Sequence, residues 1–172
     1  MPCRVIQVVG YKNTGKTTLI ERLTDRLTCN GYIVGTIKHD AHHFDTDHPG
    51  TDTWRHRKAG AQMTAITSDQ RTVLMQEQAS SLADLLQVMA SMDIVLVEGF
   101  KHERYPKIVM IKSDEDFELI ERLREVKAAV MWDDVQAIAV PCFSIHDIDG
   151  LSGWLEEVVL RSNELGGLTV GN

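Results

Sequence analysis

Residues 10–17 match the pattern G-x-x-x-x-G-K-[ST] at every fixed position and read Gly10-Tyr11-Lys12-Asn13-Thr14-Gly15-Lys16-Thr17. The glycines let the backbone bend so that successive N–H groups point inward, where they can bind phosphate oxygens. The lysine of this pattern reaches the β- and γ-phosphates of a nucleotide, and the hydroxyl that follows it ligates Mg²⁺. The octapeptide, called the phosphate loop below, therefore predicts a site for a nucleoside triphosphate with Mg²⁺.

The sequence on either side of the phosphate loop supports this prediction, because such a loop connects a buried strand to a helix. Residues 4–9 form a short apolar run that is typical of a buried strand. Leu19, Leu23 and Leu27 then recur at four-residue steps, the spacing of one helix face. The start of that helix would add unpaired N–H groups and a positive dipole end to the phosphate site.

Strands and helices alternate along the chain, which predicts a three-layer α/β fold of the P-loop NTPase type with a mainly parallel sheet. Residues 62–67 and 71–76 flank Ser68-Asp69-Gln70 and predict an additional β-hairpin. We expect one nucleotide-binding domain over residues 1–163, followed by a flexible tail at 164–172. Other strands are expected at 33–38, 93–97, 107–112, 128–131 and 137–140, and helices at 51–59, 80–91, 116–124 and 151–161.

Composition narrows the possible functions. The 172 residues are 43% hydrophobic and 25% charged, as in soluble globular proteins. A formal charge of −7 argues against a broad nucleic-acid-binding surface. No apolar run approaches the roughly 20 residues of a membrane helix, and the N-terminus shows no signal-peptide pattern. Three scattered cysteines argue against a disulfide framework, so we expect a cytoplasmic protein without nucleic-acid or membrane partners.

Polar residues gather at three predicted strand ends, where ligands bind in open α/β sheets. These ends are the phosphate loop, residues 38–52 and residues 98–102. The last follows four aliphatic residues and resembles a Walker B strand with Glu98 in place of Asp. A carboxylate there can hold Mg²⁺ or orient the attacking water, although an acidic strand cap gives the same pattern. Glu98 and Lys16 are therefore the candidate catalytic residues.

Basic residues near these ends allow two interpretations each. Lys12 is a second lysine within the phosphate loop; it is either solvated or contacts the nucleotide of a partner subunit, as in some dimeric P-loop proteins. Lys101 and His102 either bind a ligand phosphate or lie in a solvated loop. Residues 111–114 keep only the Lys-x-Asp part of a guanine-reading motif, so the residues alone do not determine the base.

A polar segment between residues 39 and 56 contains five of the seven histidines, namely His39, His42, His43, His48 and His56. In one interpretation, Asp45, Asp47 or Asp52 meets the Mg²⁺ from a switch-like loop. In another, the histidines bind Zn²⁺ or Ni²⁺, since imidazole suits both metals, although no standard zinc spacing occurs. In the third, each histidine is solvated or makes an ordinary hydrogen bond.

Three segments together resemble the family of molybdopterin-guanine dinucleotide biosynthesis protein B, or MobB. They are residues 10–19, residues 96–102, and Ile37-Lys38-His39 with Asp45, Asp47, Pro49-Gly50 and Asp52. Arg57-Lys58-Ala59-Gly60-Ala61 also matches the family pattern. The resemblance extends from about Arg4 to the closing helix, nearly the whole chain. One departure is Thr51, where relatives often have Lys.

The resemblance implies a homodimeric P-loop protein that binds GTP with Mg²⁺ and hydrolyses it slowly at most. It implies an adaptor role in molybdenum cofactor biosynthesis, assisting the guanylyltransferase (protein A) that joins GMP to molybdopterin, itself a further candidate ligand. Carried over to matching positions, it assigns GTP binding to Gly10, Lys12, Asn13, Thr14, Gly15, Lys16, Thr17 and Thr18. It assigns Mg²⁺ to Thr17 with Glu98 or Asp52, and a ligand- or partner-facing cleft to His39, Asp45, Arg57, Lys101 and His102.

Two other functional classes share a phosphate loop. A metallochaperone GTPase for nickel or zinc insertion would carry a compact Cys/His site or a histidine-rich N-terminal tail, whereas this chain has only the diffuse cluster at 39–56. A small-molecule kinase would close an arginine-bearing lid over the transferred phosphoryl group, and no lid insert is evident. A GTP-binding adaptor is therefore the preferred hypothesis.

Overall fold

The structure, a computed structural model, describes residues 4–40, 44–133 and 138–161, with the backbone alone at 159–161. Contacts between residues divide the chain into two compact units. The first unit combines Met1–His39 with Leu82–Asn172, and the second unit is Asp40–Ser81. The predicted tail at 164–172 lies outside the described residues, and the single-domain organisation stays a prediction.

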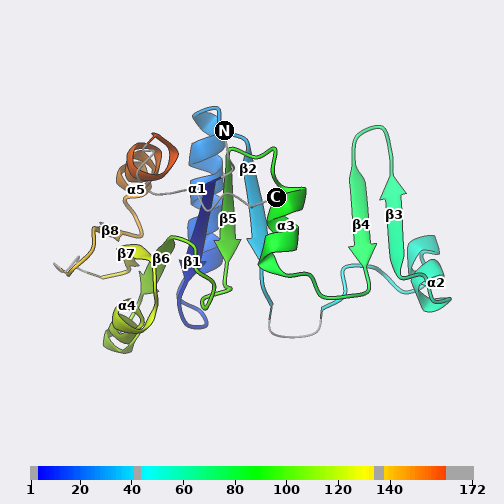
Figure 1. The fold of residues 1–172 in the computed structure, drawn as a ribbon, viewed down its shortest axis with the longest axis horizontal. Coiled ribbons are helices and arrows are strands. Elements are labelled where there is room, and N and C mark those ends of the chain that lie inside the picture. The colour runs from blue at the N-terminus through cyan, green and yellow to red at the C-terminus, as the bar shows by residue number, and fades with distance from the viewer. Residues whose placement is uncertain (1–3, 41–43, 134–137, 162–172) are drawn as a thin grey trace. The chain divides into compact units, whose positions relative to one another are not determined.

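The first unit is built on a six-stranded sheet in which all neighbouring strands are parallel (Figure 1). Its central strands carry aliphatic side chains that are buried on both faces, as parallel sheets require. Since β2, β5 and β1 are parallel neighbours, their carboxyl ends, at Lys38, Glu98 and Val9, lie side by side at one edge of the sheet. The spatial order is β2 (Val34–Lys38), β5 (Ile94–Glu98), β1 (Arg4–Val9), β6 (Lys107–Ile111), β7 (Val126–Met131) and β8 (Cys142–Ser144).

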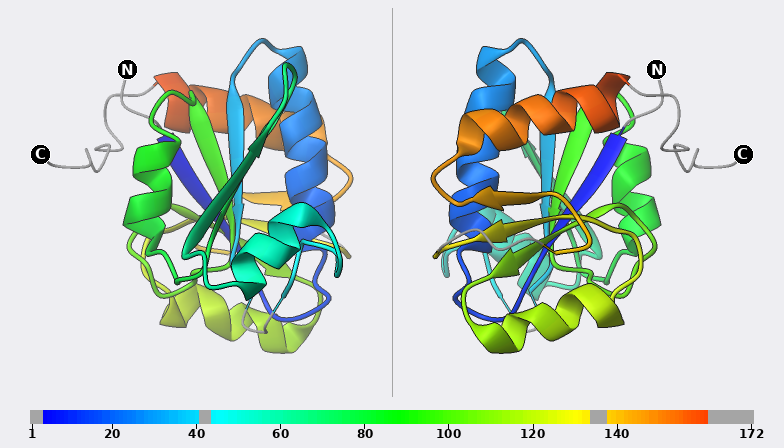
Figure 2. Two further views of the ribbon diagram at one scale, coloured as in Figure 1. Left: turned by 90° about the vertical axis from the view of Figure 1, so that its right-hand side faces the viewer. Right: turned by 90° about the vertical axis from the view of Figure 1, so that its left-hand side faces the viewer.

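Helices cover both faces of this sheet (Figures 1 and 2). Side chains that alternate along each strand belong to different buried clusters, because successive residues of a strand point to opposite faces. On one face lie α1 (Lys16–Cys29) and α5 (Ile148–Trp154), which continues as a π-helical stretch at Leu155–Arg161. On the other face lie α3 (Leu82–Val88) and α4 (Glu118–Arg122). The predicted three-layer α/β fold is confirmed.

Several predicted elements differ from the observed ones in their bounds. The expected helix at 116–124 is shorter, because Ser113 and Asp116 form a capping box that starts a 3₁₀ turn at Asp114–Phe117 before α4. The last strand is β8 rather than residues 137–140, of which residue 137 lies outside the described part. Within the described ranges, each helix is too short or too polar to cross a bilayer.

The second unit contains α2 (Asp52–Lys58) and an antiparallel hairpin of β3 (Met63–Thr67) and β4 (Thr72–Gln76) (Figure 1). Thr51 caps α2, since its hydroxyl accepts a hydrogen bond from the backbone N–H of Trp54. In the hairpin turn, the Ser68 hydroxyl accepts from the N–H groups of Gln70 and Arg71. The hairpin predicted around Ser68-Asp69-Gln70 is confirmed.

Candidate nucleotide-binding site

The phosphate loop connects β1 to α1, and its backbone requires the small residues seen in the sequence. A Cβ atom added to Gly10 would lie 2.7 Å from the Thr14 hydroxyl and 2.9 Å from the Cβ of Met110. Asn13 and Gly15 have φ angles of 63° and 90°, a left-handed conformation that glycine adopts freely and asparagine tolerates. Such turns direct backbone N–H groups into a concave surface suited to anions.

Lys16 starts α1 and bends back over the phosphate loop. Its Nζ donates to the backbone carbonyl of Tyr11 at 2.5 Å, and the hydroxyl of Thr14 donates to the same carbonyl at 3.0 Å. Burial lowers the pKa of Lys16, an effect opposed by the negative charge of Glu98. A partly desolvated ammonium gains from a bound anion, so Lys16 is placed to bind phosphate. Thr18 is half-buried on α1, and Lys12 is exposed.

Thr17 and Glu98 face each other at the junction of α1 and β5. The Thr17 hydroxyl lies 3.1 and 3.0 Å from the two carboxylate oxygens of Glu98. Lys38, at the end of β2, lies 3.4 Å from the same carboxylate, whose side chain is only 12% exposed. Hydroxyl and carboxylate oxygens are ligands that Mg²⁺ accepts in proteins. These two residues fit a magnesium site, and their roles stay predictions.

The turn after β5 is held by a residue that the sequence analysis missed. Gln7, fully buried on β1, donates from Nε2 to the carbonyls of Gly99 and Phe100 at 3.1 and 2.7 Å. Gly99 and Phe100 both have positive φ angles, 93° and 52°, which is uncommon for phenylalanine. The ring centroids of Phe100 and His39 lie 4.5 Å apart. A glutamine inside an apolar strand was the signal available in the sequence.

Lys107, a second residue with no role predicted from the sequence, holds the rest of the loop between β5 and β6. Its side chain is fully buried at the start of β6, and its Nζ donates to the carbonyls of Glu103 and, at 2.9 Å, Tyr105. Burial lowers the pKa of Lys107, and the negative charges of Glu125 and Glu103 oppose this shift. Gln7 and Lys107 thus shape the loop that carries Lys101 and His102.

Lys101 and His102 are both exposed, and Lys101 approaches the phosphate loop. The Nζ of Lys101 lies 5.5 Å from the ring centroid of Tyr11, within the range of a cation–π contact. The Tyr11 hydroxyl donates to Glu118 on α4, and this hydrogen bond raises the pKa of Tyr11. The phosphate loop is therefore in contact with the loop after β5 and with α4.

Two residues beyond β6 and β7 contact the phosphate loop backbone directly. The Trp132 Nε1 donates to the carbonyl of Thr14 at 2.8 Å, and Lys112 Nζ donates to the carbonyl of Asn13 at 3.2 Å. The sequence pattern predicts no role for Trp132 and relates Lys112 only to base recognition. No local pattern could have revealed a contact between residues 118 positions apart.

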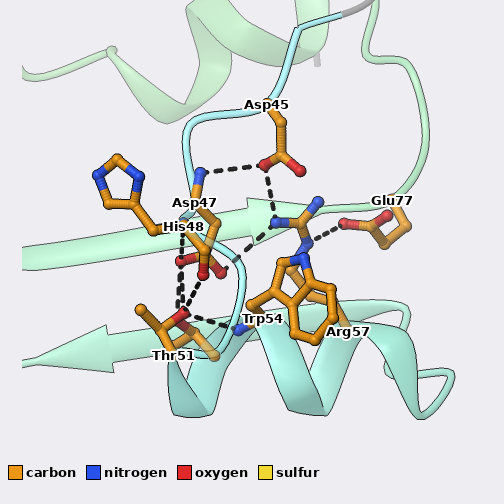
Figure 3. Close-up of polar contacts among 8 residues, drawn as sticks. Asp45, Asp47, His48, Thr51, Trp54, Arg57 and Glu77 are labelled. Atoms are coloured by element: carbon orange, nitrogen blue, oxygen red, sulfur yellow. Dashed lines mark hydrogen bonds and ion pairs between the residues drawn. The ribbon is translucent and has the colours of Figure 1, made fainter.

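Asp45 and Arg57 belong to the second unit and bind each other in a cluster of charges (Figure 3). Arg57 Nη1 lies 3.1 Å from Asp45 and 3.5 Å from Asp47, while its Nε lies 2.7 Å from Glu77. The N–H of Asp47 and the Arg57 guanidinium hold the pKa of Asp45 below its usual value. Glu77 and Asp45 raise the pKa of Arg57. The Arg57 side chain, 18% exposed, thereby joins α2 to the segment before it and the end of β4.

Of the remaining metal candidates, His39 lies in the first unit, and the others lie in the second unit or outside the described residues. Asp52 is exposed at the start of α2, 3.8 Å from Arg55, and its assignment to Mg²⁺ stays a prediction. His42 and His43 lie outside the described residues. Within residues 4–40, 44–133 and 138–161, no three His, Cys, Asp or Glu side chains are grouped to hold a metal ion.

Comparison with known protein families and curated proteins gives one consistent match. A family model described as molybdopterin guanine dinucleotide synthesis protein B matches residues 5–132. The chain is 34% identical over 166 residues to the molybdopterin-guanine dinucleotide biosynthesis adapter protein of Escherichia coli (strain K12). The alignment covers 92% of this chain and 95% of that relative. A probable adapter protein of Bacillus subtilis (strain 168) is 37% identical over 125 residues, covering 70% and 72% of the two chains.

Comparison with solved structures gives matches that agree with the family model. The crystal structure of a MobB protein homolog from Bacillus stearothermophilus is 35% identical and superimposes with a TM-score of 0.72, covering 89% of this chain and 95% of the other. That of Bacillus subtilis MobB is 28% identical with a TM-score of 0.77, covering 92% and 99%. Both sequence and architecture are therefore shared with these proteins over most of their length.

Proposed function

The chain belongs to the molybdopterin guanine dinucleotide synthesis protein B family, and from this premise we propose that it is a GTP-binding adapter in molybdenum cofactor biosynthesis. Membership confirms the resemblance seen in the three sequence segments. The observation that supports nucleotide binding is the convergence at one sheet edge of the phosphate loop, Lys16, and the Thr17–Glu98 pair.

In this proposal each group at the sheet edge has one task. The N–H groups of the phosphate loop and the start of α1 bind the phosphates, and Lys16 stabilises charge on the β- and γ-phosphates. Thr17 and Glu98 would hold Mg²⁺, which would neutralise phosphate charge when bound. Hydrolysis is slow at most, with Lys16 and Glu98 as its catalytic residues. The adapter role is inferred from the similarity to the Escherichia coli adapter protein.

We propose that the adapter's partner is the molybdopterin guanylyltransferase and that the chain acts as a homodimer. The hairpin of the second unit supports a protein contact, since a two-stranded sheet is marginal in water. Apolar side chains are exposed on both of its faces: Met63 at 55% and Leu74 at 59% on one, and Ile66 at 53% and Val73 at 41% on the other. A hairpin that exposes apolar side chains on both faces would gain stability from a protein surface that covers it.

Isothermal titration tests the nucleotide part of the proposal. In the presence of Mg²⁺, GTP should bind more tightly than ATP, and the Lys16→Ala variant should lose affinity for both. Arg26→Ala, on the same helix in an exposed ion pair with Asp149, serves as the control that keeps wild-type affinity. Equal or reversed preference between GTP and ATP would contradict the assignment of GTP.

Co-purification tests the partner. Tagged protein drawn from a native extract should retain the guanylyltransferase, and added GTP should change the amount retained.

Sedimentation experiments test the homodimer. Double replacement of Ile66 and Leu74 by Ser should abolish dimer formation if the hairpin is the contact. A wild-type chain that sediments as a monomer at all concentrations would refute the homodimer.

A further inference from the structure

We infer that Trp132 and Lys112 are positioning residues that aim two N–H groups of the phosphate loop at the bound phosphates. Both residues leave the sheet at its ligand-binding edge, Lys112 directly after β6 and Trp132 directly after β7. The two strands are parallel neighbours that pair Ile111 with Met131. Because the proposed effect is on phosphate binding, this role rests on the function proposed above.

The two side chains bind consecutive carbonyls of the loop. Trp132 Nε1 donates to the carbonyl of Thr14 at 2.8 Å, and Lys112 Nζ donates to the carbonyl of Asn13 at 3.2 Å. The ammonium of Lys112 also lies 5.8 Å from the ring centroid of Trp132, in cation–π range. The backbone N–H of Trp132 donates to the carbonyl of Ile111 at 3.2 Å, which ties the two strand ends together.

The consequence follows from the planarity of the peptide bond. In a trans peptide the carbonyl and the next residue's N–H lie in one plane and point in opposite directions. The carbonyl of Asn13 shares its plane with the N–H of Thr14, and the carbonyl of Thr14 shares its plane with the N–H of Gly15. A donor that holds each carbonyl on the β6–β7 side therefore turns both N–H groups away from that side, into the loop.

Packing around Gly15 reinforces this orientation. A Cβ atom added to Gly15 would lie 2.6 Å from Cζ2 of Trp132, so the indole ring lies directly against the loop backbone. Gly15 has a φ of 90°, and Asn13 a φ of 63°, conformations that need outside support when a side chain is present. The Trp132 side chain is nevertheless 36% exposed, so the hydrogen bond to Thr14, rather than deep burial, defines its position.

An exposed aromatic ring at this edge could instead stack on the nucleotide base, and the two roles differ in a measurable way. A residue that orients phosphate-binding N–H groups affects every ligand with the same phosphates, whatever its base. A residue that stacks on the base affects only ligands that carry one. Inorganic pyrophosphate with Mg²⁺, which has no base, separates the two.

Trp132→Phe keeps an aromatic ring and removes the N–H donor. We expect it to weaken binding of GTP, ATP and pyrophosphate by the same factor, about 3- to 10-fold, the scale of one lost hydrogen bond. Lys112→Met, which keeps the length of an exposed side chain without its donors, should act in the same direction. Trp154→Phe is the matched control and should leave affinity unchanged, because Trp154, on α5, packs against Phe143 of β8.

Titration calorimetry of these variants, each checked for its fold by circular dichroism, decides the matter. Unchanged affinity in both Trp132→Phe and Lys112→Met would overturn the inference, as would a loss confined to GTP and ATP with pyrophosphate unaffected. If Lys16→Ala loses binding while both variants keep it, only the positioning role is wrong. If the wild-type chain binds none of the three ligands, the proposed function is wrong and this inference with it.

Discussion

The hydroxyl of Thr17 lies 3.0 Å from a carboxylate oxygen of Glu98, which joins the first turn of α1 to the carboxyl end of β5. The two residues are 81 positions apart in the chain. Lys38 on β2 reaches the same carboxylate, so three neighbouring elements converge on one oxygen pair. The geometry makes Glu98 the residue whose replacement should be most informative about Mg²⁺.

Glu98→Gln should weaken nucleotide binding only when Mg²⁺ is present. The amide cannot supply the negative charge that a divalent ion prefers, and a loss of about 10- to 100-fold is the scale seen when metal-site partners are changed. Titrations of GTP with Mg²⁺ and with EDTA measure the difference. Glu121→Gln, an exposed carboxylate on α4, controls for net charge. Equal losses with and without Mg²⁺ would mean that Glu98 acts on the loop rather than on the ion.

Gly15→Ala should destabilise the protein by about 1–3 kcal/mol, because the new methyl group meets the Trp132 ring and a φ of 90° strains any L-residue. Urea unfolding measures this change. Gly153→Ala on α5 is the control, since a Cβ there meets open space and alanine favours helix by about 1 kcal/mol. In a Trp132→Ala background the Gly15→Ala cost should shrink without vanishing. A cost that is independent of Trp132 would leave backbone strain as its sole cause.

Lys107→Met should destabilise the first unit by about 1–3 kcal/mol. The methionine fills a similar volume, but it leaves the carbonyls of Glu103 and Tyr105 without their donor. Lys127→Met, on β7 in a half-exposed ion pair with Glu125, is the control and should change stability much less. Because the loop also carries Lys101, hydrogen exchange of residues 99–106 should rise in Lys107→Met. Unaltered exchange there would show that Lys107 does not hold the loop.

Asp45→Asn should reduce stability at neutral pH but not in acid. The pKa of Asp45 is lowered in the folded protein by the N–H of Asp47 and by Arg57, so its ionised form favours folding. This stabilisation is complete above the unfolded pKa of about 3.9 and is lost as pH falls through the lower folded pKa. Thermal unfolding of both chains between pH 7 and pH 2.5 should show curves that converge in acid. Asp69→Asn in the hairpin turn is the control, and a difference that persists at pH 2.5 would contradict the ion-pair explanation.

Features set by neighbouring residues were predictable. The phosphate loop between a buried strand and an amphipathic helix, the hairpin at Ser68-Asp69-Gln70 and the alternating α/β pattern all depend on residues close together in the chain. Element ends were less predictable, because a local capping box at Ser113 and Asp116 shortens α4. The mutual contact of Asp45 and Arg57 was also not foreseen, since both were expected to face a ligand or partner.

The amino-acid pattern alone was sufficient to identify a phosphate loop with its lysine and hydroxyl, because one continuous octapeptide supplies all of them. The order of strands in space decided which distant side chains support that loop. Since β6 lies beside β1 and β7 lies beside β6, Lys112 and Trp132 reach the carbonyls of Asn13 and Thr14. Since β5 lies on the other side of β1, Gln7 reaches the turn after β5. Hydrogen bonds act only over about 3 Å, so such partners exist only once the sheet has assembled.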